Sequence, residues 1–246
     1  MKITFFDTIP STNLYLKENY QKLDNLKAVV AKHQTAGRGR TGRSWKDSEG
    51  LLMSILIKEN IIPKYVESLS LLVCASIFKA LKKYTSDIII KWPNDILINS
   101  KKVCGILLES VVKEKIECIV IGFGININDS KFDEDIENKA TSLFLETGTR
   151  NNINNLANEI YEIFLIDYEN FLNGSNECFN ICKNNSCLIN KKVVYNTFGN
   201  EEEAVVRDIL QNGHILLETK DGLLERSSGE ITFHYNYYND KQSDWK

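Results

Sequence analysis

The order of apolar and polar positions divides the chain into strands and helices that alternate only loosely. Apolar residues recur at helical spacing along 65–84 and 156–172, which predicts two long amphipathic helices. A shorter helix is expected near the start, capped by Thr12 or Asn13. Short β-branched or alternating runs predict strands at 3–6, 28–33, 51–58, 88–91, 95–98, 102–112 and 116–126. Because several strands follow one another as hairpins, we expect an α+β fold with a mixed β-sheet flanked by helices.

The sequence changes character after Leu172. Residues 173–190 are polar and predict a linker. The turn signals Asn212-Gly213 and Asp221-Gly222 lie between later apolar runs. These runs predict short strands at 192–196, 204–210, 215–219, 223–225 and 230–235. Regular spacing of this kind is typical of a small SH3-like β-barrel, so we expect two domains, at 1–185 and 186–246.

Composition and charge exclude several classes of protein. The net charge of −3 disfavours a general nucleic-acid binder, which needs clustered Lys and Arg at the phosphates. No apolar run is long enough to span a bilayer, and the first residues lack the zones of a secretory signal, so we expect no membrane partner. The six cysteines do not form a compact disulfide framework, which favours a cytoplasmic location.

The most informative segment is the glycine- and arginine-rich stretch Gly37-Arg38-Gly39-Arg40-Thr41-Gly42-Arg43-Ser44-Trp45. It contains a formal G-x-G-x-x-G after a strand, but a dinucleotide site requires a helix next, and here the next regular element is a strand. A phosphate loop ending in Gly-Lys-Ser/Thr is absent, and no kinase motif follows. Glycine lets a backbone approach an anion closely, and arginine suits phosphate and carboxylate oxygens. The segment therefore favours a site that gathers two anions; the alternative is a solvated loop that binds nothing specific.

Further candidates lie at strand ends. Lys91-Trp92-Pro93-Asn94-Asp95 interrupts two apolar strands, and Pro93 marks a break there because it lacks a ladder donor. Lys102 follows a turn, and Gly105 inside the next strand indicates a close approach to the backbone. The alternatives are a solvated lysine and a simple bulge. Asn126, after Gly122 and Gly124, could contact a ligand or cap a turn.

In this order, these motifs resemble those of the bacterial biotin protein ligases. Gly-Arg-Gly-Arg-x-Gly-Arg-x-Trp, Lys-Trp-Pro-Asn-Asp, Lys-x-x-Gly-Ile-Leu-x-Glu and Gly-x-Gly-Ile-Asn follow one another, after the start Ser11-Thr12-Asn13. The resemblance extends from Phe6 to about Thr232. It implies an enzyme that adenylates biotin with ATP and Mg²⁺, then transfers biotin to a lysine of the biotin carboxyl carrier protein of a carboxylase.

The resemblance also implies roles for particular residues. The biotin site would comprise Ser11, Thr12, Asn13, Gln34, Gly37, Arg38, Gly39, Arg40, Lys102 and Gly105. The adenylate site would comprise Arg40, Arg43, Trp45, Asn94, Lys102 and Asn126. Lys102, Arg40 and Arg38 would serve catalysis, because preorganised cations stabilise the charge that gathers at the α-phosphate. The sequence does not indicate which residues would bind the metal.

Two rival functions are weaker. A lipoate ligase shares the fold and the adenylate chemistry, but its loop should carry an arginine followed by a glycine triplet. An RG-type nucleic-acid-binding module belongs to another class, and the net acidity disfavours it. Many relatives carry an N-terminal DNA-binding domain, and this sequence begins at the first catalytic strand, so we expect no specific DNA partner. Relatives often dimerise, and we expect a weak homodimer.

The cysteines and histidines are not assigned to chemistry. Cys178, Cys182 and Cys187 have no nearby histidine that would complete a four-ligand zinc set, so we interpret them as reduced cysteines. Cys74, Cys104 and Cys118 lie on apolar elements and are expected in the core.

Overall fold

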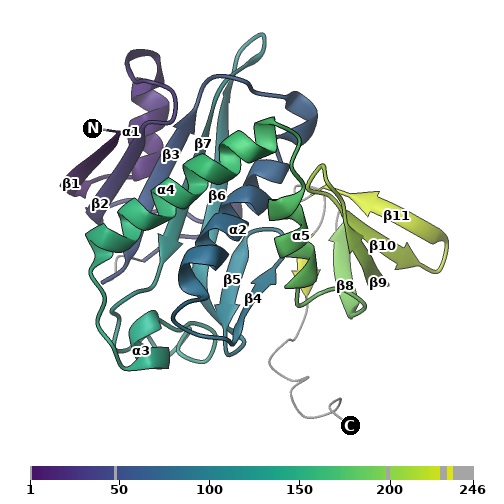
Figure 1. The fold of residues 1–246 in the computed structure, drawn as a ribbon. Coiled ribbons are helices and arrows are strands. Elements are labelled where there is room, and N and C mark those ends of the chain that lie inside the picture. Colours follow the sequence, from purple (N-terminus) through teal and green to yellow (C-terminus); the bar gives the residue numbers. More distant parts are fainter. Residues whose placement is uncertain (1, 47–48, 198–199, 228–231, 235–246) are drawn as a thin grey trace.

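The computed structural model describes residues 2–46, 49–197, 200–227 and 232–234. Its centre is a seven-stranded sheet in the order β1-β2-β3-β7-β6-β5-β4 (Figure 1). The strands are β1 (Ile3–Ile9), β2 (Ala28–Gln34), β3 (Leu51–Ile57), β4 (Ile88–Lys91), β5 (Asp95–Ile98), β6 (Lys101–Val112) and β7 (Ile116–Ile125). Only the β1–β2 pair is parallel; the other neighbours are antiparallel. The predicted mixed sheet is therefore confirmed.

One face of the sheet is covered by two long helices. Helices α2 (Ser68–Leu81) and α4 (Ile153–Leu172) pack together across it, as Figure 1 shows. In β3, Leu51, Met53, Ile55 and Ile57 all belong to the main core beneath these helices. Side chains alternate between the faces of a strand, so the even-numbered residues of β3 face the other way. That second face holds the site.

The second face is only partly covered. Helix α1 (Thr12–Asn19) lies against its β3–β7 region, where Leu16 and Leu56 join a smaller core. The helix begins at Ser11, whose Oγ accepts a hydrogen bond from Leu14 N. The predicted N-cap, Thr12 or Asn13, is therefore wrong by one or two residues, because the N-cap is Ser11. Beyond α1 the face carries Gly105, Gly122 and Gly124 instead of large side chains, which leaves room for a ligand.

The predicted linker at 173–190 is wrong in part, because it contains helix α5 (Glu177–Asn184). Polar residues dominate α5, but Cys178 and Cys182 are buried against α2, and this single apolar edge is enough to dock a short helix. A further short helix, α3 (Leu143–Thr147), begins at Ser142 and was not predicted. Within the described part of the chain, none of the helices combines the length and the apolar composition that spanning a bilayer requires.

The C-terminal part forms a second, antiparallel sheet in the order β11-β10-β9-β8-β12. Its strands are β8 (Lys192–Thr197), β9 (Asn200–Ile209), β10 (Ile215–Thr219), β11 (Gly222–Arg226) and β12 (Thr232–His234). The predicted turns at Gly213 and Gly222 are confirmed, and both glycines have a positive φ. Of the strand predicted at 230–235, residues 230, 231 and 235 lie outside the described residues. Whether the sheet closes into a barrel stays a prediction.

The two sheets are joined by specific contacts. The buried Trp92 donates from Nε1 to the carbonyl oxygen of Gly213 at 2.9 Å, and Ser68 donates from Oγ to that of Gln211 at 2.6 Å. A Cβ on Gly213 would lie 2.7 Å from the Glu67 carbonyl carbon. The hairpin turn therefore packs directly onto the start of α2 and onto the Lys-Trp-Pro-Asn-Asp segment.

Candidate active site

A cavity of about 280 Å³ lies on the open face of the seven-stranded sheet. Most residues predicted for the site line this one cavity, although they come from five separate stretches of sequence: Ser11, Thr12, Asn13, Gln34, Arg38, Gly39, Arg40, Arg43, Trp45, Asn94, Lys102 and Gly105. The strand order explains this convergence. Gly105 on β6 pairs with Asp95 on β5 and with Gly124 on β7, so distant motifs become neighbours across the sheet.

Two predicted residues lie outside the lining. Asn126 is buried; its Nδ2 donates to the carbonyl oxygen of Thr141 at 3.0 Å, so its amide supports the chain that follows β7. Gly37 lies behind the loop, where its carbonyl accepts from Trp45 N at 3.1 Å. A Cβ on Gly37 would meet the Trp45 carbonyl oxygen at 2.5 Å. The absence of a side chain at Gly37 therefore lets its backbone pack closely against that of Trp45.

One end of the cavity is polar and uncharged. Gln34 Oε1 accepts from Thr12 N at 2.7 Å and lies 3.0 Å from Thr12 Oγ1. Ser54 Oγ lies 2.7 Å from Thr12 Oγ1 and 2.6 Å from Asn13 Oδ1. Ser11, Thr12, Asn13 and Ser54 are all buried. Fixed oxygen atoms of this kind suit a ligand that carries N–H groups.

The other end is cationic. Arg40, Arg43, Lys91 and Lys102 contribute to the lining here, whereas Arg38, which also lines the cavity, lies 3.8 Å from Glu109 Oε1 on the side of Asn13. Lys102 Nζ lies 2.7 Å from Asp95 Oδ1, and Arg40 donates from Nη1 to Asn94 Oδ1 at 3.0 Å. Burial lowers the pKa of the Arg40 guanidinium, while the charges of Asp95 and Glu67 oppose that effect. Several cations in the lining of one cavity suit a polyanionic ligand.

Trp45 lies over the glycines in the middle of the sheet. A Cβ on Gly124 would lie 2.3 Å from Trp45 Cε2, and one on Gly105 would lie 2.8 Å from Trp45 Cζ3. Lys102 Nζ is 5.6 Å from the centre of the Trp45 ring, within cation–π range. The missing side chains of Gly105 and Gly124 thus let the indole ring lie against the strands and form one wall of the cavity.

The glycine- and arginine-rich loop has internal structure. Arg38 and Ser44 form an isolated β-bridge, and Gly39 N donates to the carbonyl oxygen of Arg43 at 2.7 Å. Residues Arg40–Gly42 form one short 3₁₀ turn, η2, with a positive φ at Gly42. The turn directs Arg40 toward Asn94 and leaves Arg38 and Arg43 also at the cavity.

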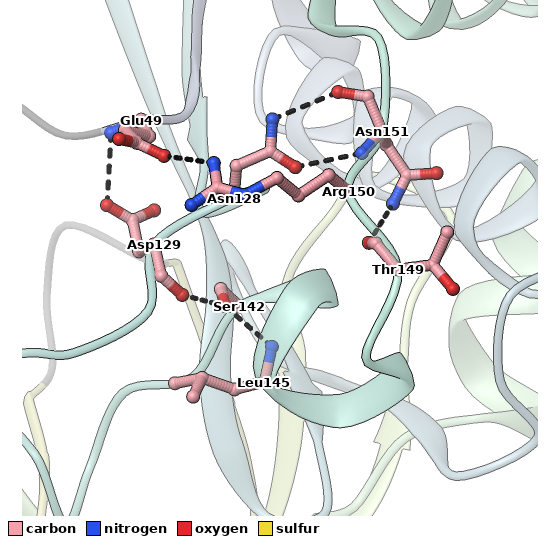
Figure 2. Close-up of polar contacts among 8 residues, drawn as sticks. All are labelled: Glu49, Asn128, Asp129, Ser142, Leu145, Thr149, Arg150 and Asn151. Carbon is pink, nitrogen blue, oxygen red and sulfur yellow. Dashed lines mark hydrogen bonds and ion pairs between the residues drawn. The ribbon is translucent and has the colours of Figure 1, made fainter.

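The far end of the loop is tied to the segment after β7 (Figure 2). Glu49 donates from its backbone N to Asp129 Oδ1 at 3.0 Å, and its carboxylate accepts from Arg150 at 2.7 Å. Asn128 exchanges two hydrogen bonds with the backbone of Asn151, both at 2.9 Å. These contacts fix where the loop re-enters the sheet at β3, and none of them was predicted from the sequence.

Four further residues, two in the lining and two bonded to lining residues, had no role predicted from the sequence. Lys91 and Asp95 belong to the Lys-Trp-Pro-Asn-Asp motif, and Glu109 ends the Lys-x-x-Gly-Ile-Leu-x-Glu motif. Membership of these motifs is the feature of the sequence that could have indicated a role for them. Ser54 gave a weaker signal, a hydroxyl within the apolar run LLMSILI of β3. Only the pairing of Ser54 with Gly122 on β7, against which Asn13 lies, shows that Ser54 lies on the same face as the site, where it supports Thr12 and Asn13 from behind.

Metal ligands are scarce in this site. Within the described ranges, no cluster of three or more His, Cys, Asp or Glu side chains could hold a metal ion. Cys178 and Cys182 are buried and unbridged, and burial raises the pKa of Cys178 to about 12. The interpretation of these cysteines as ordinary reduced residues stays a prediction.

An open sheet face with an acceptor-rich end, an aromatic wall and a cationic end is typical of an enzyme that activates a small anionic substrate. The model of the biotin/lipoate A/B protein ligase family matches residues 5–126. The chain belongs to that family, and the proteins that it resembles include several biotin protein ligases.

Individual comparisons define the extent of the likeness. The bifunctional ligase/repressor BirA of Bacillus spizizenii is 30% identical over 210 residues, which cover 82% of this chain but 65% of that protein. The biotin–[acetyl-CoA-carboxylase] ligase of Mycobacterium tuberculosis is 26% identical over 215 residues, 82% of this chain and 77% of that one. The biotin protein ligase from Aquifex aeolicus, solved with biotin and ATP, superposes with a TM-score of 0.84 at 27% identity, covering 94% and 98% of the two chains. This chain thus spans less than two thirds of the first relative.

Proposed function

We propose that this protein is a biotin protein ligase, which converts biotin and ATP into biotinyl-5′-AMP and transfers the biotin to a lysine of a biotin carboxyl carrier protein. One observation carries the proposal. A single cavity joins the acceptor-rich end at Thr12, Asn13 and Gln34 to a cationic end at Arg40 and Lys102. The cyclic urea of biotin has N–H groups for the first end, and its carboxylate has a negative charge for the second.

In the first step, an oxygen of the biotin carboxylate attacks the α-phosphorus of ATP. A new P–O bond forms, the bond from the α-phosphorus to the bridging oxygen breaks, and pyrophosphate leaves with the electron pair. Negative charge gathers at one phosphorus during this step. Lys102 and Arg40 lie at the cationic end, where their charges would stabilise it. Asp95 holds the Lys102 ammonium at 2.7 Å until a substrate anion arrives.

In the second step, the neutral amine of a carrier lysine attacks the acyl carbon of biotinyl-5′-AMP. The C–N bond forms, the C–O bond to the phosphate breaks, AMP leaves with the electron pair, and the amine loses a proton. No covalent enzyme intermediate is required. The contribution of this chain is to hold the mixed anhydride and to shield it from water beneath the loop that carries Trp45.

Magnesium enters the proposal as part of the nucleotide. Among the described lining residues, Asp95 supplies the only carboxylate, and it is paired with Lys102. Mg²⁺ is commonly bound by one or two carboxylates together with substrate phosphates, and a lining with one carboxylate fits that pattern rather than a metal cage built from protein alone. When bound, the ion would neutralise phosphate charge.

The decisive test is biotin-dependent exchange between ATP and labelled pyrophosphate, followed by transfer of labelled biotin to a purified carrier domain. We expect both reactions with biotin and neither with lipoate. Exchange that depends on lipoate would instead support the lipoate-ligase alternative on the same fold. Salt-sensitive RNA binding without any exchange would support a nucleic-acid-binding module.

A further inference from the structure

Glu109 links three elements around the acceptor-rich end of the cavity. It lies on β6, two residues beyond Leu107, and its side chain is 20% exposed. Glu109 Oε2 accepts from Asn13 Nδ2 at 2.8 Å, and Oε1 accepts from Lys17 Nζ at 2.7 Å. Arg38 Nη1 from the loop lies 3.8 Å from Oε1. Burial acts to raise the pKa of Glu109, but the bonds from Lys17 and Asn13 outweigh it and lower the pKa overall, so the carboxylate is ionised.

The position of Asn13 leaves its amide only one satisfactory orientation. Its side chain crosses β7 at Gly122, where a Cβ would lie 2.0 Å from Asn13 Oδ1. On the β6 side, the amide meets Glu109 Oε2 and, at 3.4 Å, the carbonyl oxygen of Leu107. Both are acceptors, so the amide nitrogen must face them. Oδ1 is thereby directed toward Ser54 Oγ at 2.6 Å.

This orientation makes the end of the cavity rich in acceptors. Asn13 Oδ1 accepts the Ser54 hydroxyl proton, and Gln34 Oε1 is already an acceptor from Thr12 N. The contacts of Thr12 Oγ1 with Ser54 Oγ and with Gln34 Oε1 then share the single Thr12 hydroxyl proton. The contacts Ser54–Asn13, Ser54–Thr12 and Thr12–Gln34 therefore have only the two hydroxyl protons of Ser54 and Thr12 to share. A ligand with N–H donors supplies what this arrangement lacks.

We propose that Glu109 is a positioning residue for biotin: it fixes the Asn13 amide so that oxygen atoms, rather than an N–H group, face the urea N–H groups of the ligand. The inference rests on the proposed function and adds to it a residue that determines specificity. Glu109 acts through Asn13, since it is the Asn13 side chain, not its own, that lines the cavity.

The test swaps the hydrogen-bond donor at Asn13 and the acceptor at Glu109 by substitution. In Glu109→Gln, the charged Lys17 retains the remaining oxygen, so the new amide nitrogen faces Asn13 and turns that amide around. We expect the biotin KM in the exchange assay to rise about tenfold or more, with the ATP KM within about twofold of wild type. Asn13→Asp should raise the biotin KM similarly, because two carboxylates then face each other. The double variant Asn13→Asp/Glu109→Gln again pairs an amide with a carboxylate, with the carboxylate now at position 13 and the amide at position 109. It should return the biotin KM to within about threefold of wild type.

Lys17→Met is the matched control, because it removes the ion pair but leaves Glu109 bonded to Asn13. We expect its biotin KM to stay within about twofold of wild type. An unchanged biotin KM in Glu109→Gln overturns the inference, and so does an equal rise in Lys17→Met combined with no recovery in the double variant. Should Glu109→Gln fail to fold, the comparison of Asn13→Asp with the double variant decides the same point. A wild-type chain without biotin-dependent exchange overturns the proposed function and this inference with it.

Discussion

Lys102 and Gly105 face the same side of β6 although they are three residues apart. A Cβ on Gly105 would lie 2.8 Å from Lys102 Nζ. In a regular strand, residues at an odd separation point to opposite faces. The pairing of β6 with β5 shifts between Ile96 and Leu97, whose partners are Cys104 and Lys102, so Val103 is an extra residue. This bulge is what brings the Lys102 ammonium round to the cavity.

Replacing Lys102 should therefore impair adenylation far more than folding. Lys102→Ala removes a cation from the end of the cavity where we propose that the α-phosphate binds, and we expect a loss of roughly 2–4 kcal/mol in the transition state, about 30- to 1,000-fold in exchange rate. Lys101→Ala is the control, because Lys101 Nζ donates to the Glu137 carbonyl oxygen at 3.1 Å, away from the cavity. It should exchange at nearly the wild-type rate. A loss confined to Lys101→Ala would show that the two lysines have been assigned the wrong way round.

Gly124→Ala should displace Trp45. The new methyl group would lie 2.3 Å from Trp45 Cε2, so the ring must leave the sheet. We expect roughly a tenfold rise in the ATP KM and little change in thermal stability, since Trp45 is only partly buried. Trp45→Ala should have a similar effect, and Gly124→Ala should add little to it in the double variant. Fully additive effects of the two changes would contradict the proposed contact.

Gly213→Ala should loosen the attachment of the C-terminal sheet. Both Gly213 and Gly222 have a positive φ, but a Cβ at Gly213 meets the backbone of Glu67 at 2.7 Å, and a Cβ at Gly222 meets nothing within 4 Å. Gly222→Ala thus reports the cost of the backbone conformation alone, roughly 1 kcal/mol. Gly213→Ala should destabilise by about 1–3 kcal/mol more in urea unfolding. Equal losses in the two variants would show that the turn does not need close packing on α2.

The Glu109 carboxylate should contribute to acid sensitivity. Because its pKa in the folded chain is lowered from the ordinary 4.5, its ionised form stabilises the fold at pH values above 4.5. That contribution is lost as the pH falls below 4.5 through the folded pKa. Glu109→Gln should therefore show a shallower loss of unfolding free energy than wild type as the pH is lowered from about 5. Identical pH profiles from chemical denaturation would rule out this contribution.

Elements with a clear apolar periodicity could be predicted from the sequence alone. The strands at 88–91 and 95–98 match β4 and β5 residue for residue, and α4 begins within three residues of its predicted start. Apolar spacing reports burial directly, so long periodic segments could be predicted. Helix α5 could not, because its apolar edge is short and its docking partner α2 lies far away in the sequence.

Motif order predicted the residues of the site, but their arrangement around one cavity depends on the tertiary structure. Lys102 reaches the cavity because of a bulge that depends on the partner strand β5, and Ser54 reaches Thr12 and Asn13 because β3 lies beside Gly122 of β7. Asn126 belongs to a matching motif yet bonds to Thr141 instead of lining the cavity. Local patterns fix which face a side chain takes within a regular strand, whereas register, bulges and neighbouring strands are set by contacts between distant segments.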